Sequence, residues 1–291
     1  MCVKTYIHPF GNASKLSRGH SLSAAIGSQK ALAGAGIHRM HRPEQNLLLA
    51  SLPAEERRRL FPQLELVSLA QADILHQAGE TQDWAYFPTD SVVSLIFVMG
   101  NGASTEISIV GREGVVGVSL FMGRSTALGK VVVSNAGYAY RLKKVVLLHE
   151  FNHSAATQQL LLRYTQALLT QMAQTAVCNR HHGLEQQLCR RLLLTSDRLQ
   201  SSTISLTHKM IADALGVRRE GISEAAVRLQ AAGLISYRRG HINILDRSGL
   251  EKRCCECYRV VKTEFDRLLP NPGAGTGVPE QKLALTPTLR N

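Results

Sequence analysis

Residues Ile204–Asp246 decide the fold, and they read ISLTHKMIADALGVRREGISEAAVRLQAAGLISYRRGHINILD. Thr207 is a predicted N-cap, because its hydroxyl can accept a hydrogen bond from a free amide of the helix that follows. Gly216 then gives the backbone freedom for a tight turn. A second helix follows, with an inward apolar face of Ile222, Ala225, Ala226 and Leu229. The spacing of Ala212, Gly216 and Ile222 is typical of a helix-turn-helix.

The outward face of the second helix carries side chains suited to DNA. Arginine pairs bidentately with guanine, and glutamate accepts from a cytosine amine. Gly233 ends the helix, and residues 234–237 and 242–245 are predicted strands of a wing whose tip holds two arginines. We predict base-edge contacts from Arg219, Glu220 and Ser223, with Glu224 beside them. We predict phosphate contacts from Arg218, Arg238 and Arg239, and further DNA contacts from Thr207 and His208. The alternative is an amphipathic helical pair with a solvated charged face.

Chain length and net charge are weaker evidence about the fold and the partner than the helix-turn-helix pattern. The 291 residues are enough for two domains of ordinary size. The net charge of +12 suggests a polyanionic partner. However, residues 1–43 hold six Lys or Arg and no acid, so half of the excess lies in an N-terminal arm and the other 248 residues supply +6. The total charge is therefore weak support for the helix-turn-helix.

In the N-terminal part of the chain, the spacing of apolar residues is typical of strands more than of helices. The arm is predicted to be disordered, and a helix is expected over 46–60, with Ser51 and Pro53 as cap and first-turn proline. Eight short apolar or alternating runs separated by glycines then indicate a double-sheet β-roll. The expected strands are 64–69, 73–76, 84–87, 92–98, 105–110, 115–120, 130–134 and 137–142.

From Lys144 to about Leu199 the pattern is helical. An apolar stripe at spacings of three and four predicts that a long helix pairs with its copy in a two-fold dimer, or alternatively packs on the β-roll. The stripe consists of Leu161, Tyr164, Thr165, Leu168, Met172 and Thr175. Gly183 breaks this run before the first helix of the DNA-binding domain.

The expected domains are an arm (1–43), a β-roll (44–143), a hinge and dimer helix (144–183), a winged helix-turn-helix (184–258), and a helix end with a disordered tail (259–291).

A β-roll, a long helix and a winged helix in this order resemble the CRP/FNR family of bacterial transcription regulators, over roughly Asn46 to Tyr258. The strongest resemblance is GVRREGISEAAVRLQAAGLI, in which Arg219 and Glu220 occupy two positions that usually contact bases. The resemblance implies an α+β fold: an N-terminal double-stranded β-helix (a jelly-roll-like β-roll), a long dimerisation helix and a C-terminal winged helix-turn-helix. It also implies a homodimer on a palindromic operator, with RNA polymerase as a candidate partner. Glu224 replaces a frequent arginine, so the family's usual half-site is not carried over.

The sensor segment departs from relatives that bind cyclic AMP. Those members use a Gly-Glu pair and an Arg-Ser/Thr pair, because the cyclic phosphate needs a cation and the ribose needs an acceptor. In GREGVVGVSLFMGRSTALGKVVV, Val118 replaces the expected glutamate, and Ala127 and Leu128 fall near the expected Arg-Ser pair. Arg124 and Ser125 form a displaced version and are the candidate ligand-binding residues. We predict no response to cyclic AMP, which leaves the effector open, including a β-roll without a ligand.

Two further patterns carry possible chemistry. His149, Glu150 and His153 spell the H-E-x-x-H motif of zinc hydrolases, or else are exposed polar residues on a short helix. Cys254, Cys255 and Cys257 form a C-C-x-C group in which adjacent cysteines cannot easily face one metal, so buried or redox-reactive thiols are favoured. His181 and His182 beside Cys178 suggest a modest metal or redox site, or a helix C-cap.

The sequence thus predicts a non-enzymatic DNA-binding regulator without a metal or cofactor. The alternatives are a metal- or redox-responsive regulator that uses Cys and His, and more remotely a zinc hydrolase. No segment has the length of a membrane span or the apolar core of a secretory signal, so we expect a cytoplasmic protein without disulfides and without a membrane partner.

Overall fold

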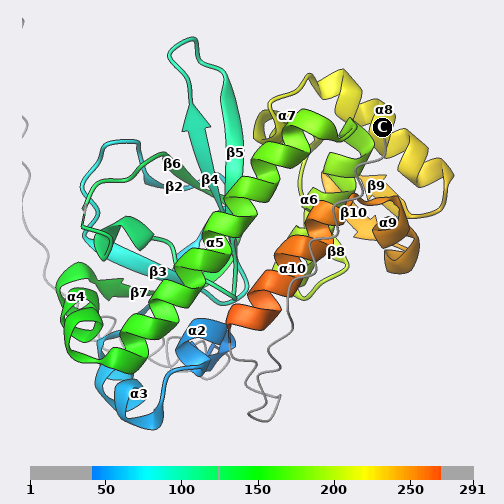
Figure 1. Ribbon diagram of the computed structural model, residues 1–291. Coiled ribbons are helices and arrows are strands. Elements are labelled where there is room, and N and C mark those ends of the chain that lie inside the picture. Colours follow the sequence, from blue (N-terminus) through cyan, green and yellow to red (C-terminus); the bar gives the residue numbers. More distant parts are fainter. Residues whose placement is uncertain (1–40, 124, 270–291) are drawn as a thin grey trace, which may run out of the picture. The chain divides into compact units, whose positions relative to one another are not determined.

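The computed structural model describes residues 41–123 and 125–269 (Figure 1). The predicted N-terminal arm up to residue 40, Arg124 and the tail from residue 270 lie outside the described residues. A β-roll of two antiparallel sheets follows the first short helices of the described chain. One sheet has the order β1 (Glu65–Leu69), β7 (Gly137–Lys143) and β3 (Trp84–Pro88). The other has the order β2 (Ile74–His76), β6 (Lys130–Asn135), β4 (Val92–Val98) and β5 (Ser104–Val110).

Apolar side chains from both sheets form the interior of the roll. The cluster contains Leu69, Val93, Val110, Val116, Val131, Val133 and Ala139. These are mainly β-branched residues on strands, where they pack well on a pleated surface. The alternating runs in the sequence therefore identified the strands with nearly correct bounds.

The predicted strand over 115–120 is wrong. Val116 forms only an isolated antiparallel bridge with Tyr86, through two backbone hydrogen bonds of 2.8 and 3.0 Å. Gly117 follows with φ of +112°, a region that favours glycine, and the chain then turns into the short 3₁₀ helix η3 (Val118–Leu120). The change in backbone direction at Gly117 ends the pairing after one residue.

The single helix predicted over 46–60 is also wrong. The structure has η1 (Pro43–Gln45), α2 (Leu47–Ala50) and α3 (Ala54–Leu60), followed by η2 (Phe61–Gln63). Pro53 is the N-cap of α3 and not a first-turn residue. Proline disfavours helical backbone in the residue before it, which accounts for the break. The buried Asn46 caps α2 and also donates to the carbonyls of Pro88 and Gly114, at 2.9 and 2.8 Å, so it ties this segment to the roll.

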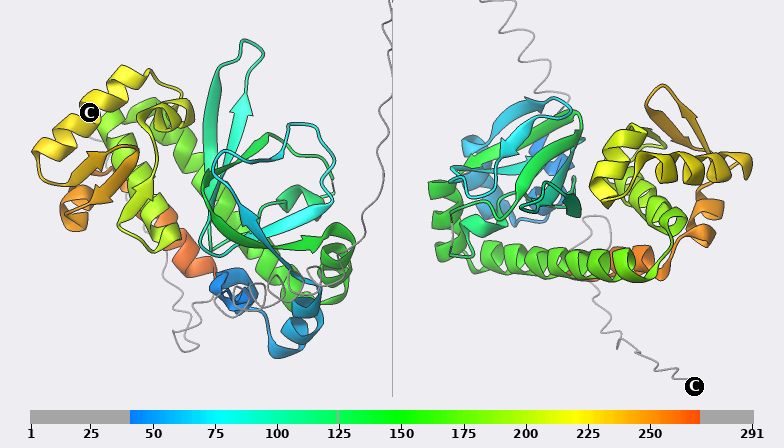
Figure 2. Two further views of the ribbon diagram at one scale, coloured as in Figure 1. Left: turned by 180° about the vertical axis from the view of Figure 1, so that it is seen from behind. Right: turned by 90° about the horizontal axis from the view of Figure 1, so that it is seen from above.

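Helical structure from Lys144 to Leu199 is confirmed, as α4 (Lys144–His153), α5 (Ala155–His181) and α6 (Leu184–Leu199). The Ser154 side chain caps α5 by accepting from the Thr157 amide. Figure 2 shows α5 running past both the β-roll and the winged helix, with α10 (Glu256–Leu268) beside it. No helix in the described part of the chain is both long and apolar enough to cross a membrane.

The predicted dimer stripe of α5 packs within its own chain. Five of its six residues are buried, and Met172 is partly buried. Tyr164 contacts Phe265 of α10 edge-on, with ring centroids 6.3 Å apart. Packing on the β-roll, the alternative interpretation, therefore describes this stripe. The exposed apolar residues of α5 are instead Leu162, Leu169 and Val177.

The winged helix-turn-helix consists of β8 (Thr203–Ser205), α7 (His208–Leu215), α8 (Arg219–Ala231), β9 (Ile235–Arg238), β10 (His241–Ile244) and α9 (Arg247–Arg253). The two wing strands are confirmed with their bounds shifted by one residue. The sequence did not reveal β8, which pairs with β10 and completes a three-stranded sheet in the order β8-β10-β9. Three residues give too short a pattern for recognition, and β8 exists because β10 offers it an edge.

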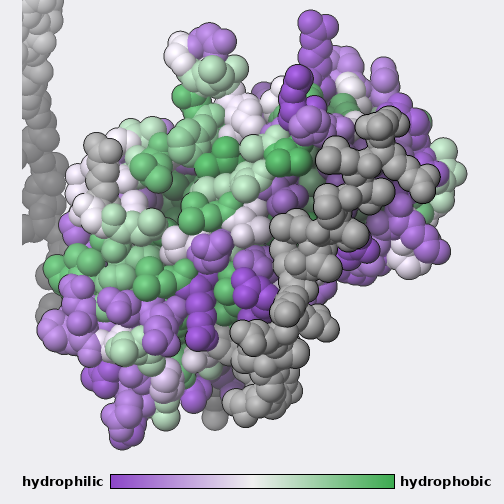
Figure 3. All heavy atoms as spheres, in the orientation of Figure 1, coloured by the Kyte–Doolittle hydropathy of each residue, from purple (hydrophilic) through white to green (hydrophobic). Residues whose placement is uncertain are grey.

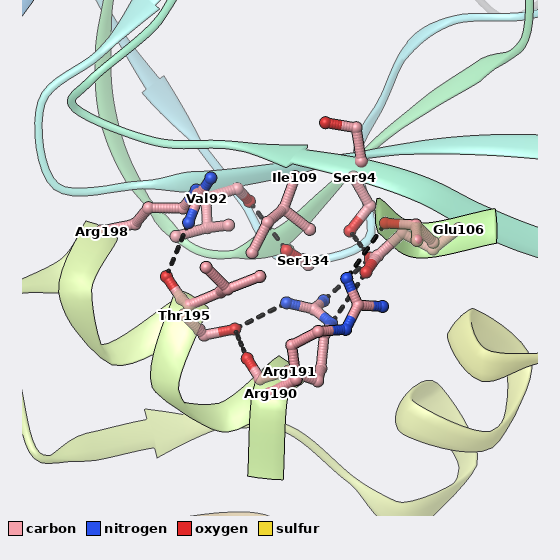
Figure 4. Close-up of polar contacts among 12 residues, drawn as sticks. Val92, Ser94, Glu106, Ile109, Ser134, Arg190, Arg191, Thr195 and Arg198 are labelled. Atoms are coloured by element: carbon pink, nitrogen blue, oxygen red, sulfur yellow. Dashed lines mark hydrogen bonds and ion pairs between the residues drawn. The ribbon is translucent and has the colours of Figure 1, made fainter. Parts of the chain in front are cut away.

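Buried ion pairs connect α6 to the β-roll (Figure 4). Arg191 meets Glu106 of β5 in a two-point contact, with Nε–Oε1 at 2.8 Å and an Nη–Oε2 hydrogen bond of 2.9 Å. The side chains are only 4% and 7% exposed. Ser94 of β4 also donates to Glu106. Both partners are therefore nearly free of water and depend on each other for charge compensation.

A second arginine of α6 extends this network. Arg198 pairs with Glu113, with Nε–Oε1 at 2.8 Å, and donates to the Gln171 side chain of α5 at 2.6 Å. Gln171 in turn donates to Ser108 and to the carbonyl of Ile109, both on β5. The polar network therefore joins α6, α5 and the β-roll through buried side chains.

Glu106→Gln is expected to lower the free energy of unfolding by about 3–5 kcal/mol, because the buried guanidinium of Arg191 loses the counter-charge of this carboxylate. Urea unfolding of the full chain measures this. The control is Glu65→Gln, which breaks the Arg141 pair whose side chains are 34% and 46% exposed. An exposed pair contributes about 1 kcal/mol or less. Equal losses in the two variants would contradict the role of the buried pair.

Candidate nucleic-acid interface

The helix-turn-helix is built by two local features. Thr207 caps α7 by accepting from the Met210 amide at 3.2 Å, as predicted. Gly216 ends α7 with φ of +67°, and a Cβ at this position would lie 2.9 Å from the Thr105 hydroxyl oxygen of β5. Glycine is required twice here, for its backbone conformation and for the close approach of the β-roll. These two residues set the angle at which α8 begins.

The two faces of α8 separate as predicted. Ile222, Ala225, Ala226 and Leu229 are buried. On the opposite face Arg218, Arg219, Glu220 and Glu224 are exposed. Throughout the described chain, none of these four charged groups is engaged in an ion pair, unlike Arg228 further along α8, which pairs with Glu185. The first two turns of α8 therefore present free charge to solvent, which is the arrangement needed to contact base edges and phosphates.

His208 connects three elements of the interface. Its ring stacks on Tyr237 of β9 with centroids 4.0 Å apart, and its Nδ1 lies 3.0 Å from the Ser223 hydroxyl of α8. Burial, followed by the nearby charge of Arg219, lowers the pKa of His208. A neutral His208 therefore holds α7, α8 and the wing together. The sequence pointed to His208 and Ser223, but not to Tyr237, whose role depends on the fold.

The wing turn has an unusual residue. Arg239 and Gly240 both have positive φ, of +51° and +84°, between the paired residues Arg238 and His241. This is a two-residue hairpin turn, in which asparagine and glycine are the usual residues. A long cation with positive φ is conformationally costly, so an arginine at this exposed turn points to a function. Arg238 and Arg239 are both exposed at the tip.

A cavity of about 390 Å³ lies between the β-roll and α5. Its lining includes Val118, which stands where the glutamate of cyclic-AMP-binding relatives is expected. The lining also includes Ala127 and Leu128, which fall near the expected Arg-Ser pair. Among the described lining residues none is charged, and Gln82, Ser119 and Thr165 supply the polar groups. Ser125 is not in the lining, and its hydroxyl is hydrogen bonded to Lys144. Arg124, the other candidate ligand residue, lies outside the described residues.

The H-E-x-x-H residues lie on α4 without the geometry of a zinc hydrolase. Glu150 is buried, and its carboxylate is paired with Arg59 of α3 through contacts of 3.2 and 3.1 Å. His153 Nδ1 is hydrogen bonded to the His149 carbonyl at 2.8 Å. In the described residues no third His, Cys, Asp or Glu joins the two histidines as a metal-binding group. Glu150 therefore serves to fasten α4 to α3.

Comparison with known proteins identifies the C-terminal domain. Residues 186–253 match the family model of the Crp-like helix-turn-helix domain. The match runs from α6 to the end of α9 and contains α7, α8 and the wing. No curated protein matches the chain.

Solved structures share the fold of both domains. FixK2 from Bradyrhizobium japonicum is 17% identical, with a TM-score of 0.58 over 66% of this chain and 98% of that one. A CRP-family transcriptional regulator from Thermus thermophilus is 18% identical, with a TM-score of 0.54 over 64% and 95%. A CRP/FNR-family regulator from the same organism is 20% identical, with a TM-score of 0.54 over 65% and 97%.

The chain therefore has a Crp-like helix-turn-helix domain within the fold that solved CRP/FNR-family structures share. Its Crp-like domain carries all eight residues that the sequence pointed to as DNA contacts. The exposed residues Arg218, Arg219 and Glu220 lie together at the start of α8, and Arg238 and Arg239 lie at the wing tip. Ser223, Thr207 and His208 form the hydrogen-bonded corner between α7 and α8.

Arg239→Gly is expected to raise the free energy of unfolding by up to about 1 kcal/mol, because glycine adopts positive φ without steric cost. The same change weakens DNA binding, since it removes a cation from the wing tip. Urea unfolding and fluorescence anisotropy with labelled duplex DNA measure the two effects. Arg239→Lys is the matched control, which keeps both the charge and the strain and should resemble the parent protein. Unchanged DNA affinity in Arg239→Gly would contradict a phosphate contact.

Proposed function

We propose that this protein is a transcription regulator of the CRP/FNR type, which acts as a cytoplasmic homodimer on a palindromic operator and does not respond to cyclic AMP. The observation that carries the proposal is the exposed, unpaired charge on the first turns of α8 within a Crp-like domain. Arg228, further along the same helix, is by contrast paired with Glu185.

The interface divides into base and phosphate contacts. Arg219, Glu220 and Ser223 face outward from the start of α8, and we assign them to base edges in the major groove. Arg218 precedes α8, and Arg238 and Arg239 occupy the wing, so these three are assigned to phosphates. Thr207 and His208 sit at the start of α7, beside the same surface. His208 acts mainly by positioning Ser223, because its ring nitrogen bonds to that hydroxyl.

The exposed face of α5 supplies the proposed dimer contact. Leu162, Leu169 and Val177 recur after seven and eight residues, so they share one side of the helix. Figure 3 shows apolar side chains gathered along α5 and the adjoining β-roll on this face. The exposed Met122 and Leu128 of the β-roll extend the apolar surface. Pairing of two α5 helices buries this surface and provides two copies of α8 for successive major grooves.

The lining of the cavity indicates which kind of small-molecule effector the β-roll can bind. A cyclic nucleotide carries a phosphate, and the described lining of the cavity offers no cation to it. Any effector bound there is therefore predominantly apolar. Leu168, Leu169 and Met172 of α5 line the cavity, and Leu169 also belongs to the exposed face. Occupation of the cavity would thus act on the dimer helix directly and change the relative angle of the two winged helices.

Selection from a randomised duplex pool at near-physiological salt is expected to enrich a palindrome with two half-sites. On that operator, Arg219→Ala should reduce discrimination against random DNA, since a bidentate base contact contributes about 1–3 kcal/mol. Arg238→Ala should weaken binding to operator and random DNA alike. It should also reduce the slope of the logarithm of the binding constant against the logarithm of the salt concentration by about 1. Arg259→Ala, which removes an exposed cation on α10, is the control and should change neither. Intact discrimination in Arg219→Ala would refute the assignment of α8.

Leu162→Glu is expected to shift the protein from dimer to monomer, because two carboxylates would be buried against each other at the contact between α5 helices. Analytical ultracentrifugation over a range of concentrations measures the dissociation constant. Val145→Glu is the control, an equivalent change at an exposed apolar residue of α4. The proposed interface fails if both variants dimerise as the parent does.

A further inference from the structure

Four metal-ligand side chains meet at the junction of α5 and α10. Cys178 lies in the last turn of α5, and His182 follows directly after that helix. Cys255 is the N-cap of α10, and Cys257 lies in its first turn. The three thiol sulfurs and one ring nitrogen all lie within 4.8 Å of one another. The three cysteines are buried, and the His182 side chain is only 14% exposed.

The spacing of these atoms fits a single tetrahedral ion. The Cys178 and Cys255 sulfurs are 3.5 Å apart, and the Cys257 sulfur lies 3.5 Å from Nδ1 of His182. A tetrahedral zinc ion, with bonds of about 2.3 Å to sulfur and about 2.0–2.1 Å to nitrogen, separates its ligand atoms by roughly 3.5–3.8 Å. An iron–sulfur cluster is a poorer fit, because it distributes its ligands over several irons that are further apart.

A carboxylate outside the group orients the histidine. Nε2 of His182 lies 3.4 Å from Oε1 of Glu256, on the side of the ring away from the cysteines. When Nε2 carries the proton and faces this carboxylate, Nδ1 keeps a free lone pair toward the thiols. Metal-bound histidines in proteins are held by the same arrangement. The Gln187 side chain also donates to the His182 carbonyl at 2.9 Å and fixes the backbone there.

We propose that Cys178, His182, Cys255 and Cys257 bind one Zn²⁺ ion in a closed tetrahedral site. With four protein ligands no coordination position stays open, so the ion has a structural role and not a catalytic one. Two ligands precede the winged helix and two follow it, so residues 183–254 lie between them in the chain. The ion therefore clamps both ends of the DNA-binding domain to the end of α5.

The other two cysteines of the described chain, Cys254 and Cys189, are not ligands of the proposed site. Cys254 is next to Cys255, yet its sulfur faces the Gln186 carbonyl at 3.9 Å. Cys189 is fully buried on α6 and belongs to no metal-ligand group of the described chain. The Cys254 thiol also interacts with the Cys255 thiol, but it lies outside the group of four ligand atoms. The site is nevertheless complete, because α5 and the residue after it supply the other two ligands.

The experiment measures metal in the full-length protein, purified through a tag that binds no metal. Mass spectrometry of the elements should give one zinc per chain, without iron. Exchange for Co²⁺ should produce the visible absorption of tetrahedral cobalt with sulfur-to-cobalt charge transfer. Cys257→Ser should abolish stoichiometric binding, whereas Cys254→Ser and Cys189→Ser should retain one zinc. A parent protein without zinc that also fails to take up Zn²⁺ or Co²⁺ under reducing conditions would overturn the proposal.

Glu256→Gln tests the geometry without disturbing a ligand, and the exposed position of this side chain protects folding. Zinc affinity, measured by competition with a chromophoric chelator, should fall on the order of 10–100-fold. Glu264→Gln, another carboxylate of α10, is the control and should leave the affinity unchanged. Equal zinc affinity in the parent and in Glu256→Gln would contradict the role of the carboxylate, and equal zinc loss in Cys254→Ser and Cys257→Ser would contradict the site.

Discussion

The buried pair of Arg191 and Glu106 is the constraint on which the arrangement of the two domains depends. Removing both charges from water costs several kcal/mol per ion, and only close, well-directed contacts offset that cost. The pair therefore tolerates little displacement of α6 against β5. Arg198 and Gln171 add α5 to the same network. Because α6 is the first helix of the Crp-like domain, this polar contact fixes where α7 and α8 can lie.

The long helix α5 carries several functions on different faces. One side is buried against the β-roll and α10, the opposite side is apolar and exposed, and its C-terminal end provides two of the proposed zinc ligands. The cavity in the β-roll borders α5 as well. A change in the cavity, in the dimer contact or at the proposed zinc site would thus act on one rigid element. This shared element gives a physical route from the β-roll to the proposed DNA-binding surface, since a ligand that prefers one arrangement of α5 shifts the protein toward that arrangement.

Local patterns predicted the local structure well. The cap at Thr207, the turn at Gly216 and the inward face of α8 each depend on residues within a few positions, and all three are confirmed. The errors occur where neighbours far along the chain decide. The run over 115–120 is apolar enough for a strand, but only Val116 finds a partner. The apolar stripe of α5 that was predicted to form a dimer contact is covered by the β-roll and α10, whose positions the sequence did not reveal.

The sequence by itself determined the order of the β-roll, the long helix and the helix-turn-helix, and which charged residues of α8 are exposed, because hydrophobic period and capping are short-range properties. It also showed the thiols and the histidines, but as separate groups more than 70 residues apart. Only the tertiary structure decided that Cys178 and His182 meet Cys255 and Cys257, that Arg191 meets Glu106, and that Tyr237 supports His208. Such contacts arise from how helices and sheets pack, and a pattern within one segment carries no information about its distant partner.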